Sequence, residues 1–233
     1  MTTDPSALAI DYLLATRTAA TATAAELEQE LATIDPVHLR DALTSDGART
    51  AFWVDVYNAV ILRQPVYDFS SWRTRSRFFS RPAVTIAGRT LSLDTIEHGI
   101  LRRSRLKLGL GYAANPAPSS FEREQRVRHV DPRIHFALNC AAASCPPIAA
   151  YRAEHIEAQL DLATRGYLQQ TALPRADHLE IPVVFLWFIG DFGGPPGVRR
   201  FLRRHGVEGW GRPLRFGEWD WTPRPGRWAA DVM

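Results

Sequence analysis

The sequence predicts an α+β fold in one domain, with helices packed on a small, mostly antiparallel sheet. Segments with helical periodicity are separated by a few short stretches of strand character, two of which form a hairpin. These elements follow one another irregularly, without the strand–helix repetition that builds a parallel sheet. The chain of 233 residues is 45% hydrophobic, which is enough apolar surface for a true core and excludes a disordered chain.

The N-terminal part is predicted to be helical. Three helices are expected, at Ser6–Arg17, Ala25–Leu31 and Ala48–Leu62. The Thr/Ala-rich stretch Thr16–Ala25 joins the first two. In the third, apolar residues recur at helical spacing on one face, namely Phe52, Val56, Ala59 and Val60, and Pro65 ends the segment. We expect residues 1–47 to form a helical extension packed on a core domain of residues 48–233.

The middle of the chain predicts a hairpin followed by a helix. Val84–Ala87 and Thr90–Leu93 have strand character, and Gly88–Arg89 between them suits a two-residue turn. A helical pattern begins at Asp94 directly afterwards. Gly109–Val130 contains two prolines and several charges, and is expected to be a long irregular surface segment.

The C-terminal half predicts two further strands and one long helix. Arg133–Leu138 alternates apolar and polar side chains, which predicts a strand carrying His135. Ala153–Gln170 has the periodicity of a helix whose buried face includes Ile156, Leu160, Ala163 and Tyr167. Leu179–Val183 is expected to be a strand that continues into the aromatic segment Phe185–Phe192.

Apolar runs and the N-terminus indicate where the protein acts. The longest apolar run, Ile181–Ile189, is interrupted by Pro182 and is far shorter than the roughly 20 residues of a spanning helix. Met1–Ala9 lacks the basic region followed by an apolar stretch that begins a secretory signal. We therefore expect a cytoplasmic protein without a membrane partner.

The basic balance of the chain is weak evidence for a nucleic-acid partner. The isoelectric point is about 9.1, but Lys107 is the sole lysine and the arginines are spread along the chain. Two local clusters stand out, Arg73/Arg75/Arg77 and Arg199/Arg200/Arg203/Arg204. They are interpreted as solvated basic faces, and no nucleic-acid partner is expected.

The two cysteines, Cys140 and Cys145, lie in one short loop. Two thiols make no disulfide framework, and a cytosolic chain would keep both reduced. Cys145 precedes Pro146 and Pro147, and proline is well tolerated in the first helical turn, so Cys145 is predicted to cap a helical turn. Free backbone N–H groups and the helix dipole would then favour the nucleophilic thiolate and receive an oxyanion. Cys140 is expected to be a small buried residue at a strand end.

The predicted strand brings His135 close to Cys145, which makes His135 the candidate general base. Two explanations remain for Glu97. It forms a helix-capping box with Asp94 three residues earlier, or it orients a catalytic histidine as the third member of a triad. His98 is an alternative base or a residue of the helix surface.

Several polar residues are candidates for supporting roles: Asn58, Ser144, His98 and Asn139. Asn58 lies with Asp55 on an otherwise apolar helix, so both need buried partners. Zinc binding by Cys140, Cys145, His135 and His98 is the rival chemistry. A Cys-x4-Cys spacing without a second pair is a weak zinc signal, so no metal and no cofactor is expected.

Five segments resemble the bacterial and plant family called domain of unknown function 547. They are Phe52–Ala59, Ile96–Arg102, Asp131–Ile148, the stretch from Trp187 to Gly193, and Trp219–Thr222. The block Asp131–Ile148 is the most specific of these. The chain departs from the family pattern at Asp55, where the family usually has asparagine. It also departs after Asp220-Trp, where Thr-Pro-Arg replaces a serine followed by Leu-Asn.

The resemblance implies a fold similar to papain-like and transglutaminase-like cysteine enzymes, with a Cys–His–Glu triad. Carried over by motif, Cys145 is the nucleophile, His135 the base and Glu97 the orienting carboxylate. Both partners precede the cysteine, which requires a rearranged order, but triads are defined by geometry. The expected activity is a hydrolase or acyltransferase acting on an amide or thioester of a small molecule or peptide. A non-catalytic binding domain with the same fold is the alternative, and a zinc-binding protein the second alternative.

Overall fold

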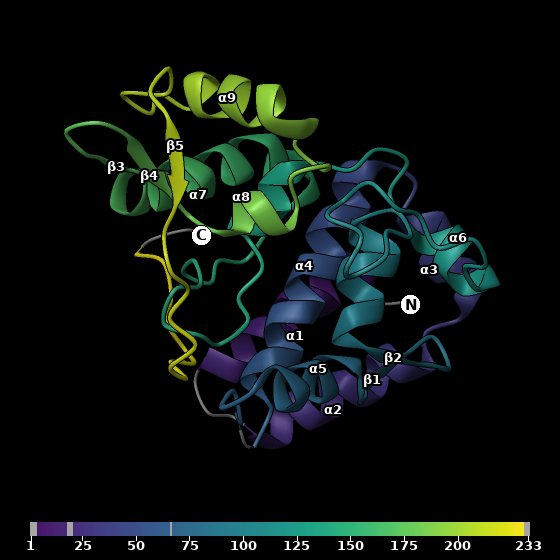
Figure 1. The fold of residues 1–233 in the computed structure, drawn as a ribbon. Helices are drawn as coiled ribbons and strands as arrows, with labels where there is room; N and C mark the ends of the chain where they lie inside the picture. Colours follow the sequence, from purple (N-terminus) through teal and green to yellow (C-terminus); the bar gives the residue numbers. More distant parts are fainter. Residues whose placement is uncertain (1–3, 18–20, 66, 231–233) are drawn as a thin grey trace.

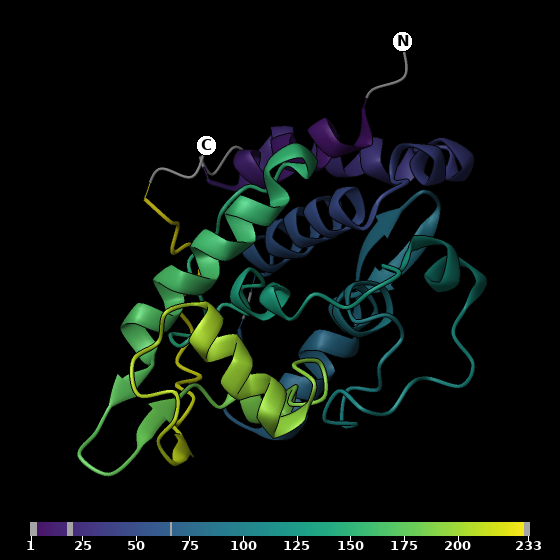
Figure 2. The ribbon, with the colours of Figure 1, turned by 90° about the horizontal axis from the view of Figure 1, so that it is seen from above.

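The helices and strands gather into two groups, each around its own apolar cluster (Figures 1 and 2). The computed structural model describes residues 4–17, 21–65 and 67–230. In Figure 1, α1 to α6 with β1 and β2 surround the larger cluster, and α7 to α9 with β3 to β5 form the second group at the upper left. Helices dominate and the sheets are small, so the fold is α+β in one domain, as predicted.

The first group contains most of the helices. Its elements are α1 (Pro5–Arg17), α2 (Thr21–Thr33), α3 (Pro36–Ala42), α4 (Asp46–Leu62), α5 (Trp72–Ser80), β1 (Pro82–Ile86), β2 (Arg89–Ser92), the π-helix η1 (Thr95–Leu101) and α6 (Ser120–Gln125). The strands β1 and β2 form an antiparallel pair.

The remaining elements are η2 (Pro132–Phe136), η3 (Ala153–His155), α7 (Ile156–Thr171), β3 (Leu173–Pro174), β4 (Leu179–Ile181), α8 (Val184–Trp187), α9 (Gly194–Arg204) and β5 (Leu214–Phe216). In the second sheet β4 lies between its neighbours, antiparallel to β3 and parallel to β5. No helix in the described residues has the length and apolar character needed to cross a bilayer.

Helix α4 is buried on every side. The predicted helix Ala48–Leu62 is confirmed. Residues 50–61 are all buried, so more of the helix is buried than the one apolar face predicted from the sequence. The reason is that α1 packs on one side of it, and η1, η3 and α7 pack around the rest. The side chain of Ser45 caps its start by accepting a hydrogen bond from Ala48 N (3.1 Å).

Asp55 is the charged residue that this helix carries into the core. Its carboxylate is fully buried and accepts hydrogen bonds from a single donor, Tyr151 N, at 3.0 and 3.2 Å. Burial raises the pKa of Asp55 well above its usual value, and the hydrogen bond from Tyr151 opposes this only in part. An asparagine at this position would accept the same bond without carrying a charge.

Asp55→Asn should therefore stabilise the protein at pH 8 by about 1–2 kcal/mol and leave its stability near pH 4 unchanged. The folded protein keeps the Asp55 proton to a higher pH than the unfolded chain, whose Asp pKa is about 3.9. Stability therefore falls as the pH rises from the unfolded pKa to the raised folded pKa. Urea unfolding at both pH values measures the difference. Asp41→Asn, at an exposed ion pair, is the control and should change little. An equal gain at both pH values would contradict the assignment of the cost to ionisation.

The predicted hairpin is confirmed, with its turn one residue earlier. The turn residues are Ala87 (φ 49°) and Gly88 (φ 72°), and Ile86 pairs with Arg89. Positive φ at both positions is what a type I′ hairpin turn requires. The end of α2 selects this register, because Ala87 N and Gly88 N donate to the carbonyl oxygens of Leu31 and Ala32, at 2.9 and 2.8 Å.

The strand prediction for Arg133–Leu138 is wrong, because this segment is the 3-10 helix η2 followed by a turn. Asp131 caps it by accepting a hydrogen bond from Arg133 N (2.9 Å), and Pro132 occupies the first turn. The alternation of side chains has another cause. Ile134 packs in the larger cluster and Phe136 in the smaller one, so η2 lies between the two groups.

Other boundaries differ by a few residues. The second helix begins at Thr21 instead of Ala25, and residues 18–20 of the expected join lie outside the described residues. Within Gly109–Val130 the chain forms the short helix α6, and β4 ends at Ile181 because Pro182 follows. In α7, Thr164 is buried where Ala163 was expected, and Ala163 is half-buried.

Candidate active site

A cavity of about 360 Å³ lies between the two groups of elements. Among its lining residues are titratable and sulfur-bearing side chains: Glu97, His98, His135, Cys140 and Cys145. Aromatic side chains form much of the rest of the wall, namely Tyr57, Trp72, Phe79, Trp187, Phe188, Trp219 and Trp221. The predicted nucleophile, base and carboxylate, with the alternative base His98, thus share one cavity. Clefts of this kind, mostly apolar with a few polar groups, are typical ligand sites.

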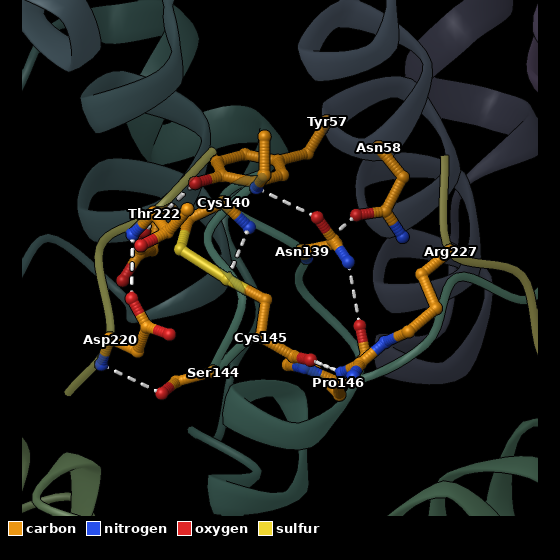
Figure 3. Close-up of a disulfide and its surroundings, with 12 residues drawn as sticks. Tyr57, Asn58, Asn139, Cys140, Ser144, Cys145, Pro146, Asp220, Thr222 and Arg227 are labelled. Carbon is orange, nitrogen blue, oxygen red and sulfur yellow. Dashed lines mark hydrogen bonds between the residues drawn. A yellow bond between two sulfur atoms is a disulfide. The ribbon is translucent and has the colours of Figure 1, made fainter. Parts of the chain in front are cut away.

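Cys140 and Cys145 are joined as a disulfide (Figure 3). The expectation of two reduced thiols is therefore wrong for this state of the protein. Cys140 is only partly buried, and its backbone N–H lies 3.0 Å from Cys145 Sγ. Cys145 itself is almost fully buried. Any reaction of these two sulfurs in the cavity therefore starts from the disulfide.

Cys145 does not cap a helix, which corrects a second prediction. Its N–H donates to Ala142 O (3.0 Å) in a turn, and no helical turn directly follows it. The two prolines lead into an isolated β-bridge between Ile148 and Trp228 instead of a helical turn. A helix dipole therefore contributes nothing to the reactivity of this cysteine.

Two buried amides hold the loop that carries the cysteines (Figure 3). Asn58 accepts a hydrogen bond from Asn139 N (2.9 Å) and donates to Ala137 O (3.1 Å). Asn139 donates to Pro146 O (2.6 Å) and accepts from Ala141 N (2.7 Å). Each side chain bonds backbone through both its carbonyl and its NH₂ group, so their contribution to the site is to position the loop.

Ser144 joins the same loop to the C-terminal segment. Its hydroxyl accepts a hydrogen bond from Asp220 N (2.8 Å), and its carbonyl accepts one from Tyr167 OH (2.8 Å). Arg227 in turn donates to Cys145 O (Figure 3). Ser144 therefore anchors the chain around the disulfide and is not among the residues that line the cavity.

A buried chain of charged and polar groups ends at His135. Its Nε2 lies 3.0 Å from Asp191 Oδ2, and Asp191 also accepts from Arg102 Nε (2.6 Å) and Nη2 (3.3 Å). Arg102 Nη1 lies 2.9 Å from His98 Nδ1. Phe188 stacks on the His135 ring at a centroid distance of 4.0 Å and lies under the Arg102 guanidinium at 4.4 Å. The orientation of His135 is thus set from one edge and one face.

The carboxylate bonded to His135 is therefore Asp191, while Glu97 makes other contacts. Glu97 Oε2 lies 3.5 Å from Tyr57 OH, and Oε1 lies 3.6 Å from His98 Nδ1. The capping-box explanation for Glu97 is wrong, because the Asp94 side chain caps nothing and pairs with Lys107 Nζ at 2.8 and 2.9 Å. Sequence reasoning missed Asp191, although an acidic residue in the aromatic segment Phe185–Phe192 was a usable signal.

The environment sets a different protonation state for each group. Burial raises the pKa of Asp191, but hydrogen bonds from His135 and Arg102 outweigh it and hold this pKa below its usual value. Burial lowers the pKa of His135, although Asp191 opposes this shift. Burial and the positive charge of Arg102 lower the pKa of His98 well below its usual value. Burial raises the pKa of Glu97 to about 7. At neutral pH, His135 is consequently a neutral imidazole beside an ionised carboxylate.

The described residues around the cavity offer no set of side chains that could bind a metal ion. Within residues 4–17, 21–65 and 67–230, no three His, Cys, Asp or Glu side chains are grouped to hold a metal ion. In the zinc set considered from the sequence, the sulfurs of Cys140 and Cys145 are bonded to each other and cannot act as thiolate ligands.

A protein-family comparison covers most of this site. The family model described as "Protein of unknown function, DUF547" matches residues 41–168, which is more than half of the chain. The match includes Glu97, His135 and Cys145, whereas Asp191 lies beyond it. No curated protein and no solved structure matches the chain. On the strength of the family match, the chain belongs to the DUF547 family.

Proposed function

We propose that this protein is a thiol hydrolase or acyltransferase that acts on an amide or thioester of a small molecule or peptide. The observation that carries the proposal is the neutral, oriented His135, which lines the same cavity as Cys145. Asp191 is ionised and can only accept, so His135 Nε2 carries the ring proton. Nδ1 then holds the lone pair that a general base needs.

The nucleophile becomes available when the disulfide is reduced. A dithiol supplies two electrons and two protons, Cys140 and Cys145 become thiols, and the reductant becomes a disulfide. His135 then takes the proton of the Cys145 thiol, and the thiolate attacks the carbonyl carbon of the substrate. The leaving amine or thiol takes that proton, and a thioester acyl-enzyme remains until water or an amine resolves it.

Two carboxylates support this chemistry in different ways. Asp191 stabilises the imidazolium that forms on His135 during attack. Glu97 was expected to orient the histidine, and with a pKa of about 7 it is proposed instead as a second group that exchanges protons within the cavity.

Acylation by a small aryl thioester, followed by mass spectrometry of the intact protein, tests the proposal. After treatment with dithiothreitol, Cys145 of the wild-type protein should be acylated by the thioester and, in a separate sample, alkylated by iodoacetamide. Without dithiothreitol, the protein should stay unmodified by either reagent. Cys145→Ala should abolish acylation. Cys140→Ala is the matched control, because it frees Cys145 permanently and should be acylated without reductant.

Equal acylation of the wild type and Cys145→Ala would overturn the proposal, as would a reduced wild type that is never acylated. The second outcome would favour a non-catalytic binding domain. The observation that favours a binding domain is that Cys145 is almost fully buried and bonded to Cys140.

A further inference from the structure

The loop between η1 and α6 turns its apolar side chains outward. Leu106, Leu108, Leu110 and Tyr112 are 43%, 75%, 46% and 57% exposed. The basic residues between them turn inward, since Arg105 Nη1 donates to Tyr112 O (2.8 Å) and Lys107 Nζ pairs with Asp94. This is the reverse of the usual surface alternation, and contiguous exposed apolar groups mark an interaction site more often than chance.

These side chains border the candidate active site. Leu108 and Leu110 line its cavity together with Trp72, which is 59% exposed at the start of α5. In Figure 2 the teal chain between η1 and α6 is an irregular excursion at the edge of the molecule. We call this surface the apolar rim: Trp72, Leu106, Leu108, Leu110 and Tyr112.

The outward orientation is built into the backbone. Leu106 N donates to Ala113 O (2.9 Å), and Gly190 N donates to Leu110 O (2.7 Å). Gly111 has φ +82°, and a Cβ there would lie 2.6 Å from the nitrogen and Oδ1 of Asp191. The loop is therefore tied to the segment that carries Asp191, and its leucines remain exposed while these contacts hold.

The two chain segments that carry the rim are basic. Residues 69–81 and 103–118 contain no aspartate or glutamate and seven basic residues: Arg73, Arg75, Arg77, Arg81, Arg103, Arg105 and Lys107. The whole chain has a net charge of only +3, so the remainder is acidic overall. In the part of the chain that the structure describes, Arg73, Arg77 and Arg103 make no ion pair. The acidic residues Asp68, Glu218 and Asp220 line a second cavity, which shares Trp219 and Trp221 with the first.

We propose that the apolar rim docks this protein on the surface of an anionic lipid bilayer, with the cavity mouth at the interface. Exposed leucine and aromatic side chains enter the boundary between headgroups and acyl chains, while neighbouring arginines attract anionic headgroups. The sequence predicted no membrane partner because its apolar runs are too short to span a bilayer, but a peripheral contact of this kind needs no spanning segment. The proposal goes beyond thiol chemistry and does not depend on it.

Sedimentation with lipid vesicles tests the docking. Full-length protein carrying Cys145→Ala is mixed with vesicles of phosphatidylcholine, with or without about 30% phosphatidylserine. Binding should require the anionic lipid and weaken as salt rises. Leu108→Asp with Leu110→Asp should lower the partition coefficient about tenfold or more, because two apolar side chains no longer enter the interface. Arg73→Gln with Arg77→Gln and Arg103→Gln should remove most of the salt dependence.

Matched controls lie on other surfaces. Leu162→Asp replaces a leucine that is 58% exposed on α7, and Arg200→Gln with Arg204→Gln removes charge from the basic helix α9. Both controls should bind like the parent. Absence of binding to anionic vesicles would overturn the proposal. So would a Leu108/Leu110 variant that binds like the parent, or loss of all binding in the α9 variant. Because Cys145 is absent throughout, these results are independent of catalysis.

Discussion

Asp191→Asn should lower the acylation rate of the reduced protein by about 100-fold or more. Asp191 Oδ2 lies within hydrogen-bond distance of both His135 Nε2 (3.0 Å) and Arg102 Nε (2.6 Å), whereas Oδ1 accepts from Arg102 Nη2 (3.3 Å). An asparagine carbonyl at the Oδ2 position would still accept from both donors, so His135 Nδ1 would keep its lone pair. The neutral amide would, however, no longer stabilise the imidazolium that forms when His135 takes the proton of Cys145.

Glu97→Gln distinguishes the two carboxylates. Since Glu97 does not contact His135, its replacement should cost about tenfold or less and remove an ionisation near pH 7 from the rate profile. Single-turnover acylation between pH 6 and 9 measures both effects, and the ¹⁵N shifts of His135 report its tautomer. If Glu97→Gln were the more damaging change, Glu97 would be the orienting carboxylate and the assignment to Asp191 would fail.

Arg102→Ala should lower the free energy of unfolding by about 3–5 kcal/mol. Arg102 and Asp191 both have fully buried side chains, and Arg102 also contacts His98 and covers Phe188. At neutral pH, removing the guanidinium leaves the Asp191 carboxylate buried with the neutral His135 as its remaining partner. Because the Arg102 charge lowers the pKa of His135, that pKa should rise in the variant. The loss should therefore be smaller at pH 5, where a protonated His135 pairs with Asp191.

Two variants control for this effect in urea unfolding. Arg103→Ala removes the exposed neighbouring arginine and should change stability by no more than about 0.5 kcal/mol. Arg102→Met combined with Asp191→Leu removes both charges and should recover part of the loss, since neither partner is left unpaired. A loss in Arg102→Ala as small as that in Arg103→Ala would show that the buried pair contributes little.

Some residues of the candidate site could be predicted from the sequence, and others could not. The motif blocks around Glu97, His135 and Cys145 are local in sequence, so they could be recognised one at a time, and the structure places all three on one cavity. Asp191 lies 56 positions after His135 and has no motif that names its partner. The same holds for the apolar rim, whose residues read as an ordinary alternating loop until their exposure is known.

Sequence alone was sufficient for the α+β class, the family, the helices α4 and α7, and the β1–β2 hairpin. Periodicity and turn chemistry act over a few residues, so they can be read without the rest of the chain. Tertiary structure decided that Arg133–Leu138 is a 3-10 helix, that Cys140 and Cys145 are bonded, and that His135 is held by Asp191. Each of these depends on burial between two apolar clusters or on contacts that only the folded chain creates, and these override local pattern.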